Sequence, residues 1–190
     1  TYMTIAAAVG GNVLIKNVIP KHLESISAKL TAAGAEVIEY DDSVRVIREK
    51  EIKAVNVKTL PHPGFPTDMQ PQMTTLLCLA QGTSIVTEGV WDNRFRYVDE
   101  LRRMGANIQV DGKVAVVQGI SAFTPAPVKA CDLRAGAALL QAALATDGVT
   151  EIEDIHYIER GYENIVEKLT GLGASIRKVE VPEPTILSSV

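Results

Sequence analysis

The feature that most constrains the fold is a pattern that occurs three times along the chain. In each copy a helix-like segment ends at a Gly-Ala pair, and residues of alternating polarity follow. The pairs begin at Gly34, Gly105 and Gly173. A second marker, a glycine between a helix-like and a strand-like segment, recurs at Gly11, Gly82 and Gly148. Because both markers share a spacing of about 70 residues, we predict three copies of one helix–strand–helix–strand unit.

The repeat places all three units in one domain, residues 1–182, followed by a tail, residues 183–190. We predict unit boundaries at about 1–52, 53–119 and 120–181. In units two and three an extended stretch precedes the first helix, whereas unit one has no such stretch before Thr1. We therefore expect the chain to be one domain of a longer protein. A native chain whose first unit is degenerate is the alternative.

Glycines, prolines and hydrophobic spacing predict the individual elements. We expect helices at 3–9, 22–33, 73–80 and 132–145, with another ending near Gly173. We expect a strand at 12–18, a hairpin that pairs 36–40 with 44–48, and extended stretches at 54–60 and 122–130. A strand should also follow each Gly-Ala pair.

Composition and charge exclude several classes of function. The net charge is -4 and Lys and Arg form no run, so the sequence indicates neither a nucleic-acid track nor a membrane anchor. The longest apolar run, 137–145, is too short to cross a bilayer, and we expect a cytoplasmic protein. Cys78 and Cys131 lack a CxxC spacing or a His-rich companion, so we expect reduced thiols, no metal and no cofactor.

The first candidate for chemistry is Asp68, in the stretch Pro66-Thr67-Asp68-Met69-Gln70. This stretch joins a proline-rich extended segment to the apolar run 73–80. A carboxylate at such a junction lies near the first free amides of a helix and can also face a ligand. The sequence therefore leaves two interpretations of Asp68 open, a helix cap and a reactive group.

Similar junctions carry another carboxylate and three arginines. Asp132 can cap the helix that follows it, and Arg134 lies in the first turn of that helix, where a cation opposes the helix dipole and suggests a nearby anion. Arg94 and Arg160 lie in the equivalent turns of units two and three. Together the arginines could hold a phosphate and a carboxylate, or they could form ordinary surface ion pairs.

Five motifs, taken in order and spacing, resemble UDP-N-acetylglucosamine enolpyruvyl transferase. They are Pro66-Thr67-Asp68-Met69-Gln70, Asn93-Arg94-Phe95, Arg103-Met104-Gly105-Ala106, Asp132-Leu133-Arg134-Ala135 and Arg160-Gly161-Tyr162-Glu163. The resemblance covers nearly the whole chain. It implies an inside-out α/β barrel, in which two similar domains of three units each enclose an active site. The chain would be the domain that contains the C-terminal part of the family sequence.

The resemblance also implies a reaction and its partners. The family transfers the enolpyruvyl group of phosphoenolpyruvate to the 3-hydroxyl of UDP-N-acetylglucosamine, the first committed step of peptidoglycan synthesis. Asp68 is similar to the carboxylate that acts as general base on that hydroxyl, and Asp132 to a second carboxylate associated with proton transfer. The chemistry suits these roles, because addition and elimination require a base, an acid and fixed cations.

The binding residues implied by the resemblance lie at the same junctions. Val90 is similar to the position whose backbone contacts the sugar nucleotide. Arg160 is similar to an arginine that meets phosphoenolpyruvate, while Arg94 and Arg134 resemble arginines of the same anionic pocket.

The resemblance has limits. The reactive loop cysteine, a phosphate-binding lysine and most uridine contacts belong to the family's other, N-terminal-part domain, so we expect this chain alone to be inactive. The alternatives are a domain of the shikimate-phosphate enolpyruvyl transferase and a non-catalytic binding or scaffold domain of the same fold.

Overall fold

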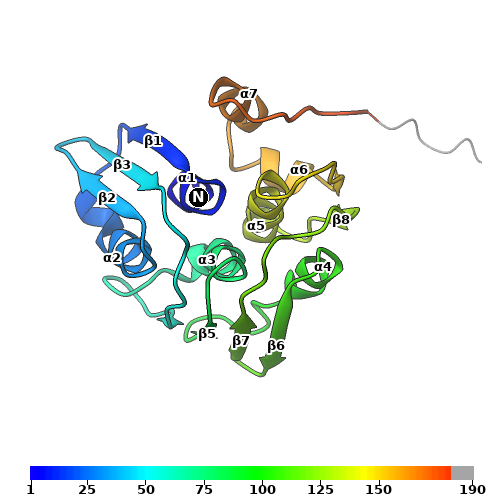
Figure 1. Cartoon of the computed structure of the whole chain (residues 1–190), viewed down its shortest axis with the longest axis horizontal. Helices are drawn as coiled ribbons and strands as arrows, with labels where there is room; N and C mark the ends of the chain where they lie inside the picture. The colour runs from blue at the N-terminus through cyan, green and yellow to red at the C-terminus, as the bar shows by residue number, and fades with distance from the viewer. Residues whose placement is uncertain (181–190) are drawn as a thin grey trace, which may run out of the picture.

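Three helices form the centre of the molecule, and the sheets surround them. The computed structural model describes residues 1–180. Helices α1 (Tyr2–Val9), α3 (Gln70–Leu77) and α5 (Leu133–Leu144) pack against one another in the middle of Figure 1. All eight residues of α3 are buried, including two threonines. Thr74 and Thr75 are tolerated there because each hydroxyl donates to the carbonyl four residues earlier, at 2.9 and 3.1 Å.

The three units contribute three sheets. In the first, the order is β1-β3-β2, with β1 (Gly11–Lys16), β2 (Glu36–Glu39) and β3 (Ser43–Arg48) all antiparallel to their neighbours. The second has the order β4-β5-β7-β6 and comprises β4 (Val57–Lys58), β5 (Thr83–Thr87), β6 (Asn107–Asp111) and β7 (Val114–Gln118). The third pairs β8 (Val128–Lys129) with β9 (Ile152–Glu153) in parallel, as β4 pairs with β5.

Short helices complete each unit. They are η1 (Pro20–Leu23), α2 (Glu24–Ala32), η2 (Thr67–Met69), α4 (Val98–Arg103), α6 (His156–Glu159) and α7 (Ile165–Gly171). One large apolar core joins the central helices to the first two sheets, and a smaller cluster packs α5 against α6 and α7. Helix α7 lies at the edge of the molecule in Figure 1.

The repeated Gly-Ala pairs have one common geometry. Gly34, Gly105 and Gly173 all have positive φ, at 102°, 87° and 96°. In each copy the glycine N–H donates to the carbonyl three residues earlier, and the alanine N–H donates to the leucine carbonyl five residues earlier, at 2.9–3.0 Å. This pair of hydrogen bonds is the Schellman motif, in which glycine adopts the left-handed conformation at little cost. The sequence repeat is therefore a repeated helix ending.

Most predicted elements are confirmed, with two corrections. The helix predicted at 73–80 begins earlier, at Gln70, because Pro71 occupies the first turn, where its missing N–H costs nothing. The strand predicted after Gly173 is wrong for the described residues, since 174–180 form no strand. Alternating polarity is insufficient there, because a strand also needs a hydrogen-bonded neighbour. The unit boundaries stay a prediction, and the predicted tail, 183–190, lies outside the described residues.

Candidate functional site

The carboxylate of Asp68 lies between two arginines from distant parts of the chain. Oδ1 is 3.1 Å from Nη2 of Arg94, and Oδ2 is 2.8 Å from Nη2 of Arg134. The Asp68 side chain is 54% exposed, whereas those of Arg94 and Arg134 are 16% and 32% exposed. The two guanidiniums are thus held near the surface by a carboxylate that solvent, or a ligand, can reach.

The structure decides against the helix-cap interpretation of Asp68. The cap position of η2 is Pro66, which has no side-chain acceptor, and Asp68 lies inside the short helix. Both of its carboxylate oxygens accept hydrogen bonds from arginine side chains. The cap interpretation of Asp68 is therefore wrong, because η2 begins at Thr67, one residue before it, and its cap position is Pro66.

Asp132, in contrast, is the cap of α5. Its backbone is extended, at φ −161°, and Oδ1 accepts hydrogen bonds from the N–H groups of Arg134 and Ala135, each at 2.8 Å. The cap fixes the first turn of α5 and with it the position from which Arg134 reaches Asp68. The anion predicted near Arg134 is thus, within the described residues, the carboxylate of Asp68.

Arg134 is charged at every relevant pH. Burial by itself lowers the pKa of Arg134, but hydrogen bonding to Tyr162 and the negative charge of Asp68 outweigh burial, so the pKa lies above its ordinary value. Arg94 follows Asn93, whose φ of 54° marks a sharp turn between β5 and α4. Its Nε is buried and has no hydrogen-bond partner among the described residues.

Sequence reasoning missed Glu88, a buried acid beside these residues. Only 1% of Glu88 is exposed. Its carboxylate accepts hydrogen bonds from the hydroxyls of Thr59 and Thr67, at 2.7 and 3.1 Å, and from the N–H groups of Val90 and Trp91, at 2.9 and 3.0 Å. A glutamate directly after a predicted strand, followed by glycine, was the available signal. Its burial depends on β4 and η2, which no local pattern places there.

The other two predicted binding residues do not join the Asp68 cluster. Val90 is 41% exposed, and its N–H is already donated to Glu88. The Arg160 guanidinium lies 5.5 Å from the ring centre of Tyr157, and within residues 1–180 no ion pair links it to Asp68. The structure thus brings Arg94 and Arg134 together at Asp68 and leaves Arg160 apart from them, while the binding of a ligand by these arginines stays a prediction.

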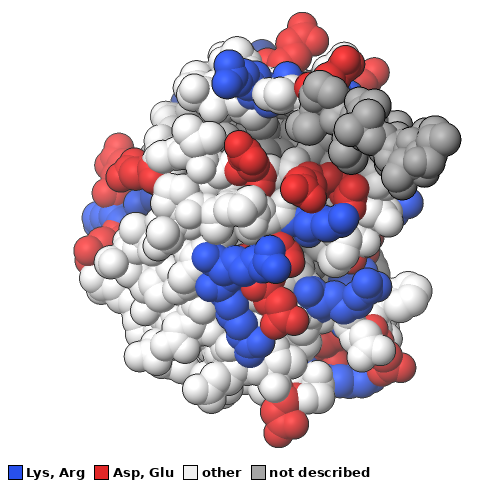
Figure 2. Space-filling model, turned by 90° about the vertical axis from the view of Figure 1, so that its right-hand side faces the viewer, with Lys and Arg blue, Asp and Glu red and all other residues white. Residues whose placement is uncertain are grey.

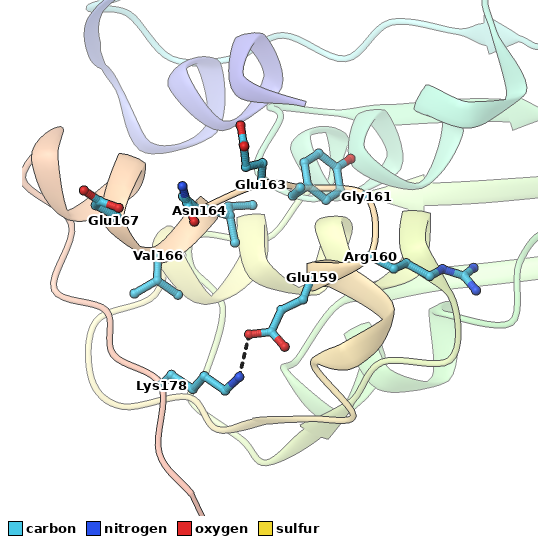
Figure 3. A pocket seen from close by; sticks show the side chains of 10 residues that line it. Glu159, Arg160, Gly161, Glu163, Asn164, Val166, Glu167 and Lys178 are labelled. Atoms are coloured by element: carbon cyan, nitrogen blue, oxygen red, sulfur yellow. Dashed lines mark hydrogen bonds and ion pairs between the residues drawn. The ribbon is translucent and has the colours of Figure 1, made fainter.

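Arg160 borders a pocket between α6 and α7. The pocket has a volume of about 700 Å³ and is lined by residues 159–167 and Lys178. In Figure 3 the Arg160 side chain points away from Glu159, which forms an ion pair of 2.7 Å with Lys178. Asp68, Arg94 and Asp132 do not line this pocket.

Charges of both signs occur on the face that carries α4 and α6. Figure 2 shows Lys and Arg side chains interspersed with Asp and Glu, and ion pairs join Lys129 to Asp154 at 3.2 Å and Arg103 to Glu100 at 3.9 Å. Across residues 1–180 there is no group of three His, Cys, Asp or Glu side chains able to hold a metal ion. Among the helices of that same part, none has the length and apolar character needed to cross a membrane.

Comparison with known proteins defines the class. A family described as EPSP synthase (3-phosphoshikimate 1-carboxyvinyltransferase) matches residues 1–169. The chain therefore belongs to this family of enolpyruvyl transferases. The three central helices with the sheets around them form the inside-out α/β barrel domain of three repeated units that the resemblance implied.

Within the family, the chain is similar to proteins named for one acceptor. It is 57% identical over 181 residues to UDP-N-acetylglucosamine 1-carboxyvinyltransferase 2 of Clostridium acetobutylicum, covering 95% of this chain and 43% of that protein. It is 54% identical to UDP-N-acetylglucosamine 1-carboxyvinyltransferase 3 of Caldanaerobacter subterraneus subsp. tengcongensis, covering 94% of this chain and 43% of that protein. The chain thus spans less than half the length of these relatives.

Solved structures agree on the fold. The enolpyruvyl transferase NikO from Streptomyces tendae superposes with a TM-score of 0.84 at 31% identity, covering 93% of this chain and 43% of that one. The EPSP synthase of Acinetobacter baumannii has a TM-score of 0.71 at 16% identity, covering 94% and 45%, and supports the fold alone. The predicted family resemblance is confirmed, while the roles assigned to single residues stay predictions.

Proposed function

We propose that this chain is part of an enzyme that transfers the enolpyruvyl group of phosphoenolpyruvate to the 3-hydroxyl of UDP-N-acetylglucosamine, in the cytoplasm and for peptidoglycan synthesis. The observation that carries the proposal is the exposed carboxylate of Asp68 held between Arg94 and Arg134. Relatives named for this acceptor, 51–57% identical, support the choice of substrate.

The reaction needs a carboxylate that can accept a proton and cations that can bind phosphate at the same place. The sugar hydroxyl oxygen bonds to C2 of phosphoenolpyruvate while its proton passes to a base and another proton reaches C3. Phosphate then leaves C2 as C3 loses a proton, which restores the double bond and gives the enolpyruvyl ether. In the proposal Asp68 takes the hydroxyl proton, and Asp132 takes part in the proton transfer at C3.

The arginines give the site a way to exchange anions. Arg94 and Arg134 each contact one oxygen of Asp68, so a substrate phosphate or carboxylate competes with Asp68 for the same donors. Binding of that anion would draw the guanidiniums away and leave Asp68 free to accept a proton from the sugar hydroxyl. The same cations would then stabilise the charge that develops on the leaving phosphate.

Arg160 and Val90 would act at the rim of this site. We propose that Arg160 turns from the ring of Tyr157 toward phosphoenolpyruvate when the enzyme closes. Val90 would contact the sugar nucleotide through its backbone. We further propose that the opposite wall of the active site belongs to an N-terminal-part domain of the same protein, because the relatives are more than twice as long as this chain. The isolated chain would then bind ligand weakly and not turn over.

Two measurements test the proposal. With both substrates the 190-residue chain should release no phosphate, and turnover comparable to a complete enzyme would contradict the idea that a second domain is needed. Titration with UDP-N-acetylglucosamine, followed by NMR, should shift the amide signals around Asp68 and Val90. A parallel titration with shikimate 3-phosphate tests the alternative acceptor, since shifts with that ligand alone would favour a shikimate-phosphate enolpyruvyl transferase domain. Shifts with neither ligand would favour a scaffold domain.

A matched pair of variants links the signal to the site. Asp68→Asn should abolish or strongly weaken the shifts. Asp99→Asn removes a comparable carboxylate, which pairs with Arg102 at 2.8 Å on the surface, and should leave the titration unchanged. Equal effects of the two substitutions would argue against a specific role for Asp68.

A further inference from the structure

We propose that Glu88 is a positioning residue, whose buried carboxylate ties the segment that carries Asp68 to the segment that carries Val90 and Trp91. The inference rests on the proposed function for its effect on ligand binding, but its structural basis is independent of that function. None of the sequence motifs that identify the family includes this residue.

The carboxylate joins two segments through separate oxygens. Oε2 accepts a hydrogen bond from the hydroxyl of Thr67, the residue directly before Asp68, at 3.1 Å. Oε1 accepts from the N–H groups of Val90 and Trp91, at 2.9 and 3.0 Å. One rigid group therefore sets the spacing between the proposed base and the segment proposed to hold the sugar nucleotide.

The end of β4 anchors this bridge. The hydroxyl of Thr59 donates to Oε1 of Glu88 at 2.7 Å and accepts from the N–H of Gly89 at 2.8 Å. A Cβ on residue 89 would lie 2.4 Å from the carbonyl oxygen of Thr59, so only glycine permits this approach. The loop thus lies directly against the backbone of Thr59, the residue that follows β4, and the Glu88 carboxylate has little room to move.

The four groups around the buried carboxylate all donate hydrogen bonds to it, which suits an ionised carboxylate because it can only accept hydrogen bonds. Removing the carboxylate would leave the part-buried amides of Val90 and Trp91 without this acceptor, and an amide that loses its hydrogen bond is less protected from solvent. A glutamine could keep all four contacts, because its oxygen can accept the bonds made to Oε1 and its amide can donate to the Thr67 hydroxyl. Glutamine is therefore the conservative variant.

The other two units show that the fold itself does not require this carboxylate. The register of the sheets places Asn17 after β1 and Asp154 after β9, where Glu88 follows β5. Asn17 is exposed, and Asp154 forms a partly exposed ion pair with Lys129. A buried acid with four donors thus occurs at this position only in the unit that carries Asp68, which points to the site and not to the repeat.

The experiment compares Glu88→Ala, Glu88→Gln and a control, Glu100→Ala. The control removes a carboxylate that accepts the N–H of Lys129 at 2.9 Å, in the same unit but away from Asp68. In Glu88→Ala we expect the Val90 and Trp91 amides to exchange with solvent about tenfold faster, and the affinity for UDP-N-acetylglucosamine to fall about tenfold, since a lost hydrogen bond of about 1.4 kcal/mol corresponds to that factor. Glu88→Gln should restore most of both values, and Glu100→Ala should change neither.

A second variant serves if Glu88→Ala does not fold. Thr67→Val breaks only the bond to Oε2, so it should weaken ligand binding while Val90 and Trp91 remain protected. Unchanged exchange in Glu88→Ala overturns the inference, and so does faster exchange with unchanged affinity. If the wild-type chain binds no sugar nucleotide, the proposed function fails. Faster exchange in Glu88→Ala, with shifted amides at Asp68, would then still support the positioning role.

Discussion

A single methyl group on α5 tests how the third unit is packed. Gly136 lies in α5 directly opposite Ile158 of α6. A Cβ added to Gly136 would lie 2.5 Å from Cγ1 and 3.2 Å from Cδ1 of Ile158, and 3.3 Å from Cβ of Ala130. Gly136→Ala therefore forces either Ile158, which is 4% exposed, or the whole of α6 to move.

Two opposing effects decide the result. Alanine favours a helix over glycine by about 0.8–1 kcal/mol. An extra methyl group in a packed core costs about 1–3 kcal/mol. Because the contact at 2.5 Å is with Cγ1, a methylene carbon bonded directly to Cβ, and not with the flexible end of the side chain, we expect the packing cost to dominate. Gly136→Ala should lower the free energy of unfolding by about 1 kcal/mol.

Urea unfolding followed by circular dichroism measures this change, and two comparisons isolate its cause. Gly171→Ala makes the same substitution at the end of α7, where nothing lies within 4 Å of the new Cβ, and should stabilise the chain by a few tenths to about 1 kcal/mol. In an Ile158→Ala background both close contacts disappear, so Gly136→Ala should become neutral or stabilising. A stabilising Gly136→Ala in the wild-type chain, or a cost that persists without Ile158, would refute the reasoning.

Two further predictions concern the cap and the thiols. Asp132→Ala should lower the free energy of unfolding by about 0.5–2 kcal/mol, whereas Asp132→Asn, which can still cap α5, should cost little; urea unfolding of both variants checks this, and equal losses would contradict the cap. Burial raises the pKa of the Cys78 thiol to about 12, and burial followed by the charge of Asp132 raises that of Cys131, so a thiol reagent at pH 8 should modify the folded chain far more slowly than the chain in urea. The pKa of Cys78 is higher in the folded chain than in the unfolded chain, so the neutral buried thiol stabilises the fold fully below the ordinary thiol pKa. This stabilisation is lost as the pH rises from about 9 toward 12. Measuring the free energy of unfolding at several pH values would detect the loss. Rapid modification of folded Cys78 at pH 8 would show that α3 is less buried than described.

Local patterns in the sequence were sufficient for the repeat and the helix ends. A Schellman ending involves six consecutive residues, so Gly34, Gly105 and Gly173 could be recognised from the chain alone. The cap formed by Asp132 involves two following amides and was equally accessible. The alternation after Gly173 looked the same as in the other units but gave no strand in 174–180, because pairing depends on a neighbouring segment and not on the residues themselves.

The sequence by itself determined the three units and the residue types available for chemistry, because short, periodic patterns specify both, while the class of fold followed from the resemblance of its motifs to a known family. Only the tertiary structure decided what Asp68 contacts. Its partners lie 26 and 66 positions away in the chain, on elements that meet only when the units pack around α1, α3 and α5. The same packing buries Glu88 between β4, η2 and its own loop. Such contacts depend on how elements distant in the chain pack together, and local sequence propensities do not predict this packing.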